Sequence, residues 1–523
     1  MVCQEQKHCG EQAFLESLRD AREVSIKLME RRNHQNFLQG LFHLELTATS
    51  TYCVERTLVL KKDGIRNPNS IWPAYTFTVD DSQCNFLLNK FLPALTATTL
   101  VESLTVQGCD RVQGFYTKLV ELLLRMQRMT SVSIIGWADF INNVDHDLAL
   151  PLLSRLQSFS VTCPTVDADT SHQLGLALGS MSQLRNLRLD TGLAPPFFWS
   201  GLQQAFSNLH NLEDLSWIST LPDESNQDLG RICRTLGSRR RLRNLELVWS
   251  SLSSDYLIAL LQNKNLDTLS INSVDNEGAH LLGNYLEANQ TLQTLNVSFV
   301  DNCCNVFRLL EGAMKHTRLS KLSLSNVRMD NDVAKTTLML FTYNDTLQDF
   351  TLSASNMKSS FLEDILLGLR ANTVLHSVAL QTTEYILDLS TSLTLQEVLV
   401  KNSTLQHLNL GQCHARTNEC VRTVAQGIMH NTALQSLCGL RATNPSIFVE
   451  ALEHNKTLTH FSSSRPEMAF YLGLNKIGRK HFVDSNLDSA LLPLVLEKAQ
   501  SIDQMQYMLQ ARADVFIRYF SIS

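Results

Sequence analysis

The sequence predicts an α/β solenoid in which one strand and one helix repeat along the chain and the strands form a parallel sheet. Two observations predict this class. A six-residue motif recurs fourteen times between Val101 and Ser463. Its first and fourth residues are apolar, and its sixth residue usually is. The copies are 24 to 30 residues apart, which is enough for one strand and one helix. Neither element can bury its apolar face until a neighbouring unit stacks on it.

The motif itself identifies the kind of repeat. Clear copies are Leu184-Leu187-Leu189, Leu242-Leu245-Leu247 and Leu405-Leu408-Leu410. The first positions of all fourteen are residues 101, 129, 156, 184, 212, 242, 266, 292, 319, 347, 375, 405, 434 and 458. This pattern is typical of leucine-rich repeats. We therefore expect a right-handed β-α horseshoe with a parallel concave sheet, outer helices and helical caps.

Within each unit the side chains of the strand should alternate in direction. For a motif that begins at position i, residues i+3 and i+5 should enter the core, and residues i+2, i+4 and i+6 should line the concave face. A helix should follow, as at residues 278–288. Asn stands three residues before the leading apolar position in seven units, where we expect it to end the helix in a left-handed conformation and to satisfy backbone groups. These are Asn263, Asn289, Asn344, Asn372, Asn402, Asn431 and Asn455.

The ends of the chain depart from the repeat. Residues 1–40 are predicted to be a helical cap, with a helix over 11–38. Residues 41–100 are predicted to hold degenerate first repeats at Ala74-Phe77-Val79 and at Leu41-Leu44-Leu46, although the second could belong to the cap. The regular array of fourteen units fills residues 101–464. Residues 465–523 should form a C-terminal helical cap, with helices near 466–480, 487–500 and 502–511.

Composition excludes several classes of partner. The net charge of −6 and pI near 6.2 give no general attraction to nucleic acid or to anionic lipid. No apolar run is long enough for a membrane span, and no signal peptide is present, so we expect a cytoplasmic protein. The basic run Arg239-Arg240-Arg241-Leu242-Arg243 makes the nucleus an alternative.

Motifs for catalysis or for metal binding are missing from the sequence. There is no GxxxxGK[ST] phosphate loop, no HExxH helix and no GxSxG elbow, so we expect no enzyme activity and no cofactor. The twelve cysteines are scattered without CxxC pairs, as in proteins with reduced thiols. Cys413, His414 and Cys420 lack a fourth ligand for zinc, so no metal site is expected either.

Binding residues are easier to predict. Most concave positions are small and polar, as at Ser103, Ser131 and Ser158, and such a face is solvated. The units at 184, 212 and 242, with one position two units further on, differ because they place charged and apolar side chains on this face or at its rim, as in a protein interface. The candidates are Arg188, Asp190, Asp214, Ile218, Glu246, Val248, Trp249 and Phe299. For Trp249 and Phe299 the alternative is local packing at the loop edge, and Trp217, at an inward position, is expected in the core.

Two stretches carry a family resemblance. The order Asn-x-Thr-Leu-x-x-Leu-x-Leu at residues 289–297 and 402–410 resembles ribonuclease-inhibitor-like leucine-rich repeats, and NOD-like receptors carry similar arrays. This chain shows no nucleotide-binding module before the repeats. It also departs from the family eight residues after the leading position, where the family has Asn or Cys. Cys109 and Cys413 fit this pattern, but other units carry a different residue there, such as Thr220, Val274, Val300 and Val327. The resemblance implies the fold but not one function, because such repeats serve many functions.

The leading functional hypothesis is a non-catalytic, intracellular protein-recognition scaffold. As a monomer, it would bind a protein partner on the concave face and its adjoining loops. One alternative is a substrate-recognition adaptor of a ubiquitin ligase, since Leu491-Leu492-Pro493-Leu494 with Leu496 resembles segments that bind elongin-type partners. Another is a GTPase activator of the Ran type, although this chain lacks the acidic tail of those proteins.

Overall fold

The computed structural model describes most of the repeat array and parts of both ends. The described residues are 21–31, 41–50, 55–61, 103–107, 120–121, 124, 129–135, 151–165, 168–193, 198–220, 227–250, 252–303, 306–382, 384–462, 465–479, 497–499 and 501–511. They divide into two units. Unit 1 holds residues up to 251 with 258–266, and unit 2 holds 252–257 with the residues from 267 onward. Helix α10 (Ser254–Leu260) contributes to both units.

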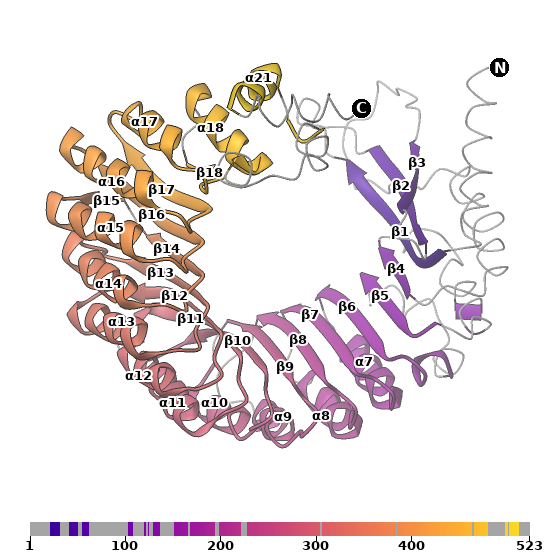
Figure 1. Cartoon of the computed structure of the whole chain (residues 1–523). Coiled ribbons are helices and arrows are strands. Elements are labelled where there is room, and N and C mark those ends of the chain that lie inside the picture. The colour runs from indigo at the N-terminus through magenta and orange to yellow at the C-terminus, as the bar shows by residue number, and fades with distance from the viewer. Residues whose placement is uncertain are drawn as a thin grey trace, which may run out of the picture. The chain divides into compact units, whose positions relative to one another are not determined.

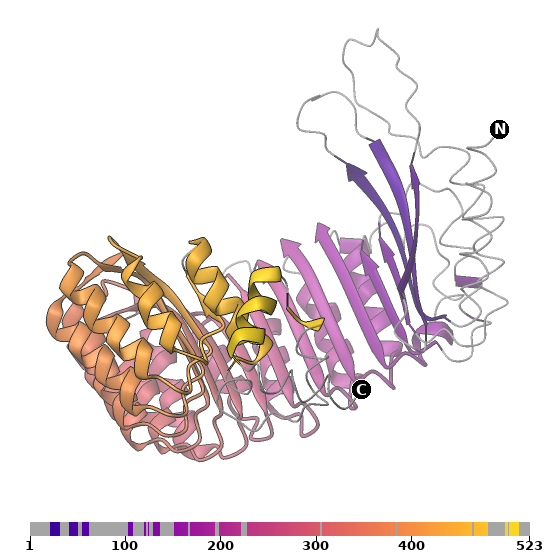
Figure 2. The same cartoon turned by 45° about the horizontal axis from the view of Figure 1, so that its top comes forward.

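Unit 1 is a sheet with helices along one face (Figures 1 and 2). Its six repeat strands are β4 (Ser103–Gln107), β5 (Ser131–Ile135), β6 (Ser158–Thr165), β7 (Asn186–Leu193), β8 (Asp214–Thr220) and β9 (Asn244–Trp249). They pair in parallel in chain order. The helices between them are α7 (Ala168–Ser180), α8 (Phe198–Asn208) and α9 (Gln227–Gly237).

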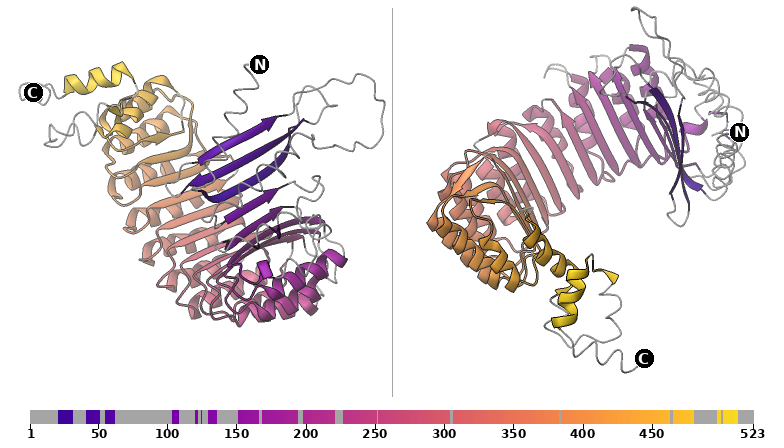
Figure 3. Two further views of the ribbon diagram at one scale, coloured as in Figure 1. Left: turned by 90° about the vertical axis from the view of Figure 1, so that its right-hand side faces the viewer. Right: turned by 90° about the horizontal axis from the view of Figure 1, so that it is seen from above.

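The N-terminal part of unit 1 differs from the prediction. Residues 21–31, expected within a helix, form strand β1 (Ala21–Arg31), which pairs in parallel with β4. Strands β2 (Leu41–Ser50) and β3 (Glu55–Lys61) extend the sheet by antiparallel pairing. Leu41-Leu44-Leu46 therefore belongs to an antiparallel extension and not to a repeat, while Ala74-Phe77-Val79 lies outside the described residues. The three strands cover the edge that β4 would otherwise leave unpaired, as Figure 3 shows.

Unit 2 continues the same strand and helix order. Its strands are β10 (Thr268–Val274), β11 (Thr294–Cys303), β12 (Lys321–Arg328), β13 (Asp349–Ser355), β14 (Ser377–Thr382), β15 (Tyr385–Leu387), β16 (His407–Ala415), β17 (Ser436–Ala442) and β18 (His460–Phe461). Helices α11 (Asn276–Ala288), α12 (Val306–Lys315), α13 (Asn331–Tyr343), α14 (Ser359–Ala371), α15 (Leu389–Lys401), α16 (Asn418–His430) and α17 (Ile447–His454) cover one face of the sheet. All paired strands of this unit are parallel.

Every one of the fourteen predicted motifs forms a strand, which confirms the leucine-rich repeat solenoid. Equivalent motif positions face each other across neighbouring strands, because Leu187 pairs with Leu215 and Leu215 with Leu245. In unit 2 the same row runs from Leu269 through Leu295 and onward. These side chains are almost fully buried, and each buried leucine stabilises the fold by roughly 1.5–3 kcal/mol.

Capping side chains start several of the helices. The carboxylates of Asp275, Asp330 and Asp388 accept hydrogen bonds from the backbone N–H groups three residues later, at 2.7, 2.9 and 2.9 Å. Thr417 does the same for α16. Each cap satisfies an N–H group that has no partner within its own helix.

The recurrent asparagines end the helices and also join successive repeats. The Oδ1 atom of Asn402 accepts from the N–H groups of Thr404 and Leu405, at 3.0 and 2.8 Å. Its Nδ2 atom donates to the carbonyl groups of Leu369 and Asn372, which belong to the preceding repeat, at 2.8 and 2.9 Å. Asn344, Asn372, Asn431 and Asn455 make the same two kinds of contact. We call this series the asparagine ladder.

The ladder satisfies backbone groups as predicted, but the backbone conformation proposed for it is wrong. The φ and ψ angles of Asn402 are −80° and 117°, which is extended and not left-handed. Asn is therefore selected for its carboxamide, which can donate and accept at once, and not for tolerance of positive φ. At the equivalent position of one unit stands His316, whose Nδ1 atom accepts from two N–H groups in the same way.

The C-terminal cap continues the ladder beyond the last repeat. Helix α18 (Pro466–Ile477) carries Asn475, whose Nδ2 atom donates to the carbonyl groups of Asn455 and Leu458 at 3.0 and 2.8 Å. Helix α21 (Ile502–Ala511) follows. Two of the three predicted cap helices are thus present, and most of the third, at 487–500, lies outside the described residues.

Replacement of Asn402 by alanine should destabilise the protein by roughly 1–3 kcal/mol, because buried carbonyl and N–H groups lose their partners. The adjacent Ser403 is exposed, so Ser403→Ala is a matched control that should change stability by less than about 0.5 kcal/mol. Urea denaturation followed by circular dichroism measures both. Equal midpoints for the two variants would contradict the structural role of the ladder.

Candidate functional site

The predicted binding residues on β7, β8 and β9 lie together on the open face of the unit 1 sheet. The strand register places Arg188, Ser216 and Glu246 in one row across the three strands, and Asp190, Ile218 and Val248 in the next row. A third row contains Asn186, Asp214 and Asn244. We call the six predicted residues among these the acidic–apolar patch; they are Arg188, Asp190, Asp214, Ile218, Glu246 and Val248.

Hydrogen bonds hold two carboxylates of the patch in place. The Ser216 hydroxyl donates to Oε2 of Glu246 at 2.6 Å, and Nδ2 of Asn244 donates to Oδ1 of Asp214. In each pair the donor lies on the strand next to that of the carboxylate, at an outward position. A carboxylate that is already oriented loses less conformational freedom when it binds a cation or an N–H group.

Charge on the patch is unbalanced. Three carboxylates face one guanidinium group, that of Arg188, so negative charge predominates. The positive side chain is exposed, and the part of the chain that the structure describes provides no hydrogen bond or ion pair to it. The patch should therefore favour a partner with basic groups.

An apolar pair lies at one end of the patch, in the row that also holds Asp190. Ile218 and Val248 are neighbours across β8 and β9, and Val248 is 37% exposed although it is aliphatic. Ile218 is half-buried. Apolar side chains beside charged ones are typical of a protein interface, in which an apolar core adjoins a polar rim.

Two of the predicted site residues do not belong to the open face. Trp249 is only 1% exposed and Phe299 only 2%, so both are core residues and not interface anchors. Trp249 packs edge-on against Trp217 at 5.3 Å between ring centroids, and Trp217 stacks on Phe206 at 5.5 Å. The prediction that Trp217 is core is confirmed.

The mistake has a physical cause in the strand register. In β9 the alternation continues without a break, so Leu245, Leu247 and Trp249 all point inward while Glu246 and Val248 point outward. Trp249 and Phe299 stand seven positions after their leading residues, one alternation step beyond the motif. In two other units the residue seven positions after the leading one has a positive φ, 57° at Ser273 and 59° at Asn326. There the next residue, Val274 or Val327, points into the core instead. The motif alone does not reveal which unit carries this shift.

Sequence reasoning also missed two residues that organise the patch. Ser216 and Asn244 resemble the many other small polar residues on the sheet, and only their position beside Glu246 and Asp214 distinguishes them. The signal was available, since both stand at outward motif positions next to a predicted carboxylate.

Part of the basic run has a structural role. Arg239 donates to the carbonyl groups of Phe206 and Ser207 at 2.6 and 2.8 Å, so it caps the C-terminal end of α8. Arg243 donates to the carbonyl group of Asn265 at 3.1 Å. Arg240 and Arg241 are exposed. Two of the four arginines are thus already engaged with backbone carbonyl groups.

Five cysteines whose side chains the structure describes are free thiols, and four of them are buried. They are Cys163, Cys233, Cys413, Cys420 and Cys438. Burial raises the pKa of the Cys413 thiol to about 12, so it is protonated and unreactive at neutral pH. Among the described residues no group of three or more His, Cys, Asp or Glu side chains is arranged to hold a metal ion.

Searches for similar proteins give little further information. No family model and no curated protein matches the chain. Among solved structures, it is similar to one described as the crystal structure of a Rad7 and Elc1 complex in yeast, with 15% identity and a TM-score of 0.33 over 73% of this chain and 81% of that one. A match this distant says nothing of function, and the repeat fold rests on the chain's own strands and helices. No described helix is long and apolar enough to cross a membrane.

The revised position of Trp249 can be tested by comparison with its exposed neighbour. Trp249→Ala should destabilise the protein by roughly 3–5 kcal/mol, since it leaves a cavity beside Trp217. Val248→Ala, on the opposite face of the same strand, should cost less than about 1 kcal/mol. Thermal and urea unfolding measure both. Similar stabilities of the two variants would show that Trp249 is not a core residue.

Proposed function

We propose that this protein is a non-catalytic recognition scaffold that binds a protein partner through the acidic–apolar patch of unit 1. The observation that carries the proposal is the contiguous arrangement of Ile218 and Val248 beside three carboxylates, two of which, Asp214 and Glu246, are held in place by hydrogen bonds. The proposal places the protein in the cytoplasm and among leucine-rich repeats of the ribonuclease-inhibitor-like type.

The chemistry of the patch defines the partner. An apolar side chain of the partner would cover Ile218 and Val248, and Lys or Arg side chains beside it would meet Asp190, Asp214 and Glu246. The apolar contact supplies most of the affinity, because desolvated central residues dominate binding energies. The charges select the orientation and accelerate association, and salt should slow that association.

The patch has no arrangement typical of catalysis. The Ser216 hydroxyl donates to Glu246 and the Asn244 amide donates to Asp214, and the described residues provide no further hydrogen bond or ion pair that would join either contact to a third catalytic group. A rigid sheet with an organised surface is better suited to binding, since little order has to be created when the partner arrives.

Val248→Lys should weaken partner binding by about tenfold or more, because it removes the more exposed residue of the apolar pair and adds a charge that repels basic groups. Ser133→Lys is the matched control: it adds the same charge to the same sheet face, on β5 outside the patch. Partners isolated with the wild-type protein and identified by mass spectrometry would be titrated against each variant. Equal affinities of both variants would remove the patch from consideration.

A photo-crosslinking residue gives a second, positional test. A benzoylphenylalanine at position 248 should crosslink to the partner, whereas the same residue at Leu176, 44% exposed on α7 of the same unit, should not. Crosslinking only from position 176 would place the partner on the helical face and contradict the proposal.

A role as a ubiquitin-ligase adaptor is the second candidate, and α21 is the observation that favours it. Ile502 is 80% exposed and Met505 is 37% exposed, one helical turn apart. On its other side, α21 contacts α18 through Tyr507 and Phe470, whose ring centroids are 6.1 Å apart. An exposed apolar stripe on a helix is a common docking element.

Substitution of both Ile502 and Met505 by aspartate tests the adaptor role without removing the cap. An adaptor would lose co-purifying ligase subunits and keep its substrate partner. If the double variant retains ligase subunits, or if the wild-type protein never binds any, the adaptor role is wrong.

A further inference from the structure

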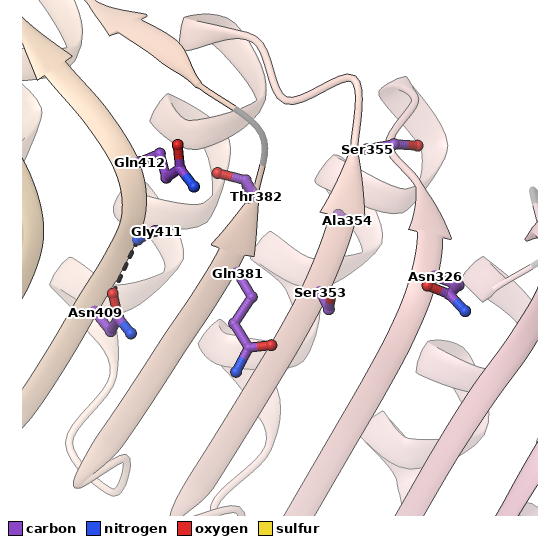
Figure 4. Close-up of a pocket in the computed structure, with 9 residues that line it drawn as sticks. All are labelled: Asn326, Ser353, Ala354, Ser355, Gln381, Thr382, Asn409, Gly411 and Gln412. Atoms are coloured by element: carbon purple, nitrogen blue, oxygen red, sulfur yellow. Dashed lines mark hydrogen bonds between the residues drawn. The ribbon is translucent and has the colours of Figure 1, made fainter. Parts of the chain in front are cut away.

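Unit 2 contains a polar hollow at the ends of its central strands, well apart in the sequence from the acidic–apolar patch. Figure 4 shows the nine residues that line it on β12, β13, β14 and β16. They are Asn326, Ser353, Ala354, Ser355, Gln381, Thr382, Asn409, Gly411 and Gln412. The volume of about 540 Å³ lies within the range of small-ligand sites, which is roughly 300–1,000 Å³.

An irregularity of the backbone forms one wall of the hollow. Asn409 pairs with Ala379, but the next pair along the two chains joins Cys413 to Tyr385, so five residues face three. Gly411 allows this with φ at 70°, and a side chain there would overlap the carbonyl oxygen of Leu380. Bulges of this kind are over-represented beside functional sites, because they redirect side chains.

The lining is uncharged and consists almost entirely of groups that both donate and accept hydrogen bonds. Four carboxamides, those of Asn326, Gln381, Asn409 and Gln412, stand with three hydroxyls, and Ala354 is the one apolar side chain. Phosphates, carboxylates and ammonium groups would find no countercharge here, and an apolar ligand would meet Ala354 as the one apolar side chain of the lining. The groups suit a ligand that is neutral and rich in hydroxyls.

Several of these groups are free to bind a ligand. The Oδ1 atom of Asn409 accepts from the Gly411 N–H at 3.0 Å, which orients its Nδ2 atom as a donor. The Thr382 hydroxyl also lines the hollow, but its oxygen is buried and is not among these groups. Gln381 is exposed, and its carboxamide has no protein partner among the described residues.

Spacing distinguishes between two neutral ligands. Each strand contributes polar groups to the hollow, and neighbouring strands are roughly 4.8 Å apart. One hexose unit advances an oligosaccharide by nearly this distance. An extended peptide presents equivalent groups at intervals of roughly 6.6 Å, since its side chains alternate. A sugar chain that crosses the strands can therefore place one ring at each strand, and a peptide cannot keep that register.

We infer that the polar hollow binds a neutral oligosaccharide, with one sugar ring over each strand end. The carboxamides of Gln381 and Gln412 donate to and accept from the ring hydroxyls, and Asn409 donates through Nδ2. This site is a second function of the chain and does not depend on partner binding by unit 1.

Titration calorimetry with three neutral probes tests the inference: chitotetraose, cellotetraose and maltotetraose. At least one should bind, and Gln381→Leu and Gln412→Leu should each weaken that binding by about tenfold. Gln348→Leu is the matched control, because Gln348 is exposed on the same unit outside the hollow, and it should bind as the wild type does. Circular dichroism checks that all three variants are folded.

Two further probes represent competing ligands, a heparin tetrasaccharide and a glutamine-rich peptide. The inference is wrong if none of the neutral sugars binds at millimolar concentration, if Gln381→Leu and Gln412→Leu both bind like the wild type, or if the charged sugar or the peptide is preferred. The same neutral sugar could reach the hollow as a free oligosaccharide or as a glycan attached to a protein, and coupling the bound sugar to albumin distinguishes the two. If the coupled sugar binds as tightly as the free one, the ligand can be a protein-attached glycan; if its affinity is lost, the ligand is a free oligosaccharide. Either result is consistent with the inference.

Discussion

The structure depends on the alternation of side chains along strands that are paired in register. Because the third and fifth residues after each leading position must be buried against the helices, the residues between them are forced onto the open face. Leu187, Leu215 and Leu245 form one such buried row, and Arg188, Ser216 and Glu246 lie beside it on the other face. The proposed binding surface is thus a direct consequence of core packing, because a shift of one residue in register would exchange the buried and the exposed side chains.

The asparagine ladder makes this register cooperative along the chain. Each carboxamide organises the turn before its own strand and also holds carbonyl groups of the preceding repeat, as Asn402 and Asn455 do. Buried polar groups of this kind are costly unless fully satisfied, so each repeat helps to define its neighbour. The donor half of these contacts extends to Asn475 in the cap, whose Nδ2 atom donates to carbonyl groups of the last repeat.

Much of the fold could be predicted from sequence because its signals are local and repeated. The motif positions correctly predicted where all fourteen repeat strands lie and that Trp217 is buried. They also predicted that six of the candidate site residues point outward from the sheet. What could not be predicted depends on backbone geometry that no motif encodes. Trp249 and Phe299 were placed on the wrong face because unbroken alternation carries them into the core, while Ser273 and Asn326 interrupt it in other units. Residues 21–31 were assigned to a helix together with the apolar residues at 14, 15 and 18, although Val24, Ile26 and Leu28 alternate as in a strand, and this segment pairs with β4.

The phase of side chains along β9 is the claim on which the surface assignment rests most directly. Single cysteine substitutions at residues 244 to 249, each labelled with a maleimide and quantified by peptide mass spectrometry, would measure it. The account predicts fast labelling at 244, 246 and 248 and protection at 245, 247 and 249 in the folded protein. Labelling at 249 as fast as at 248, or rates without a two-residue period, would contradict it.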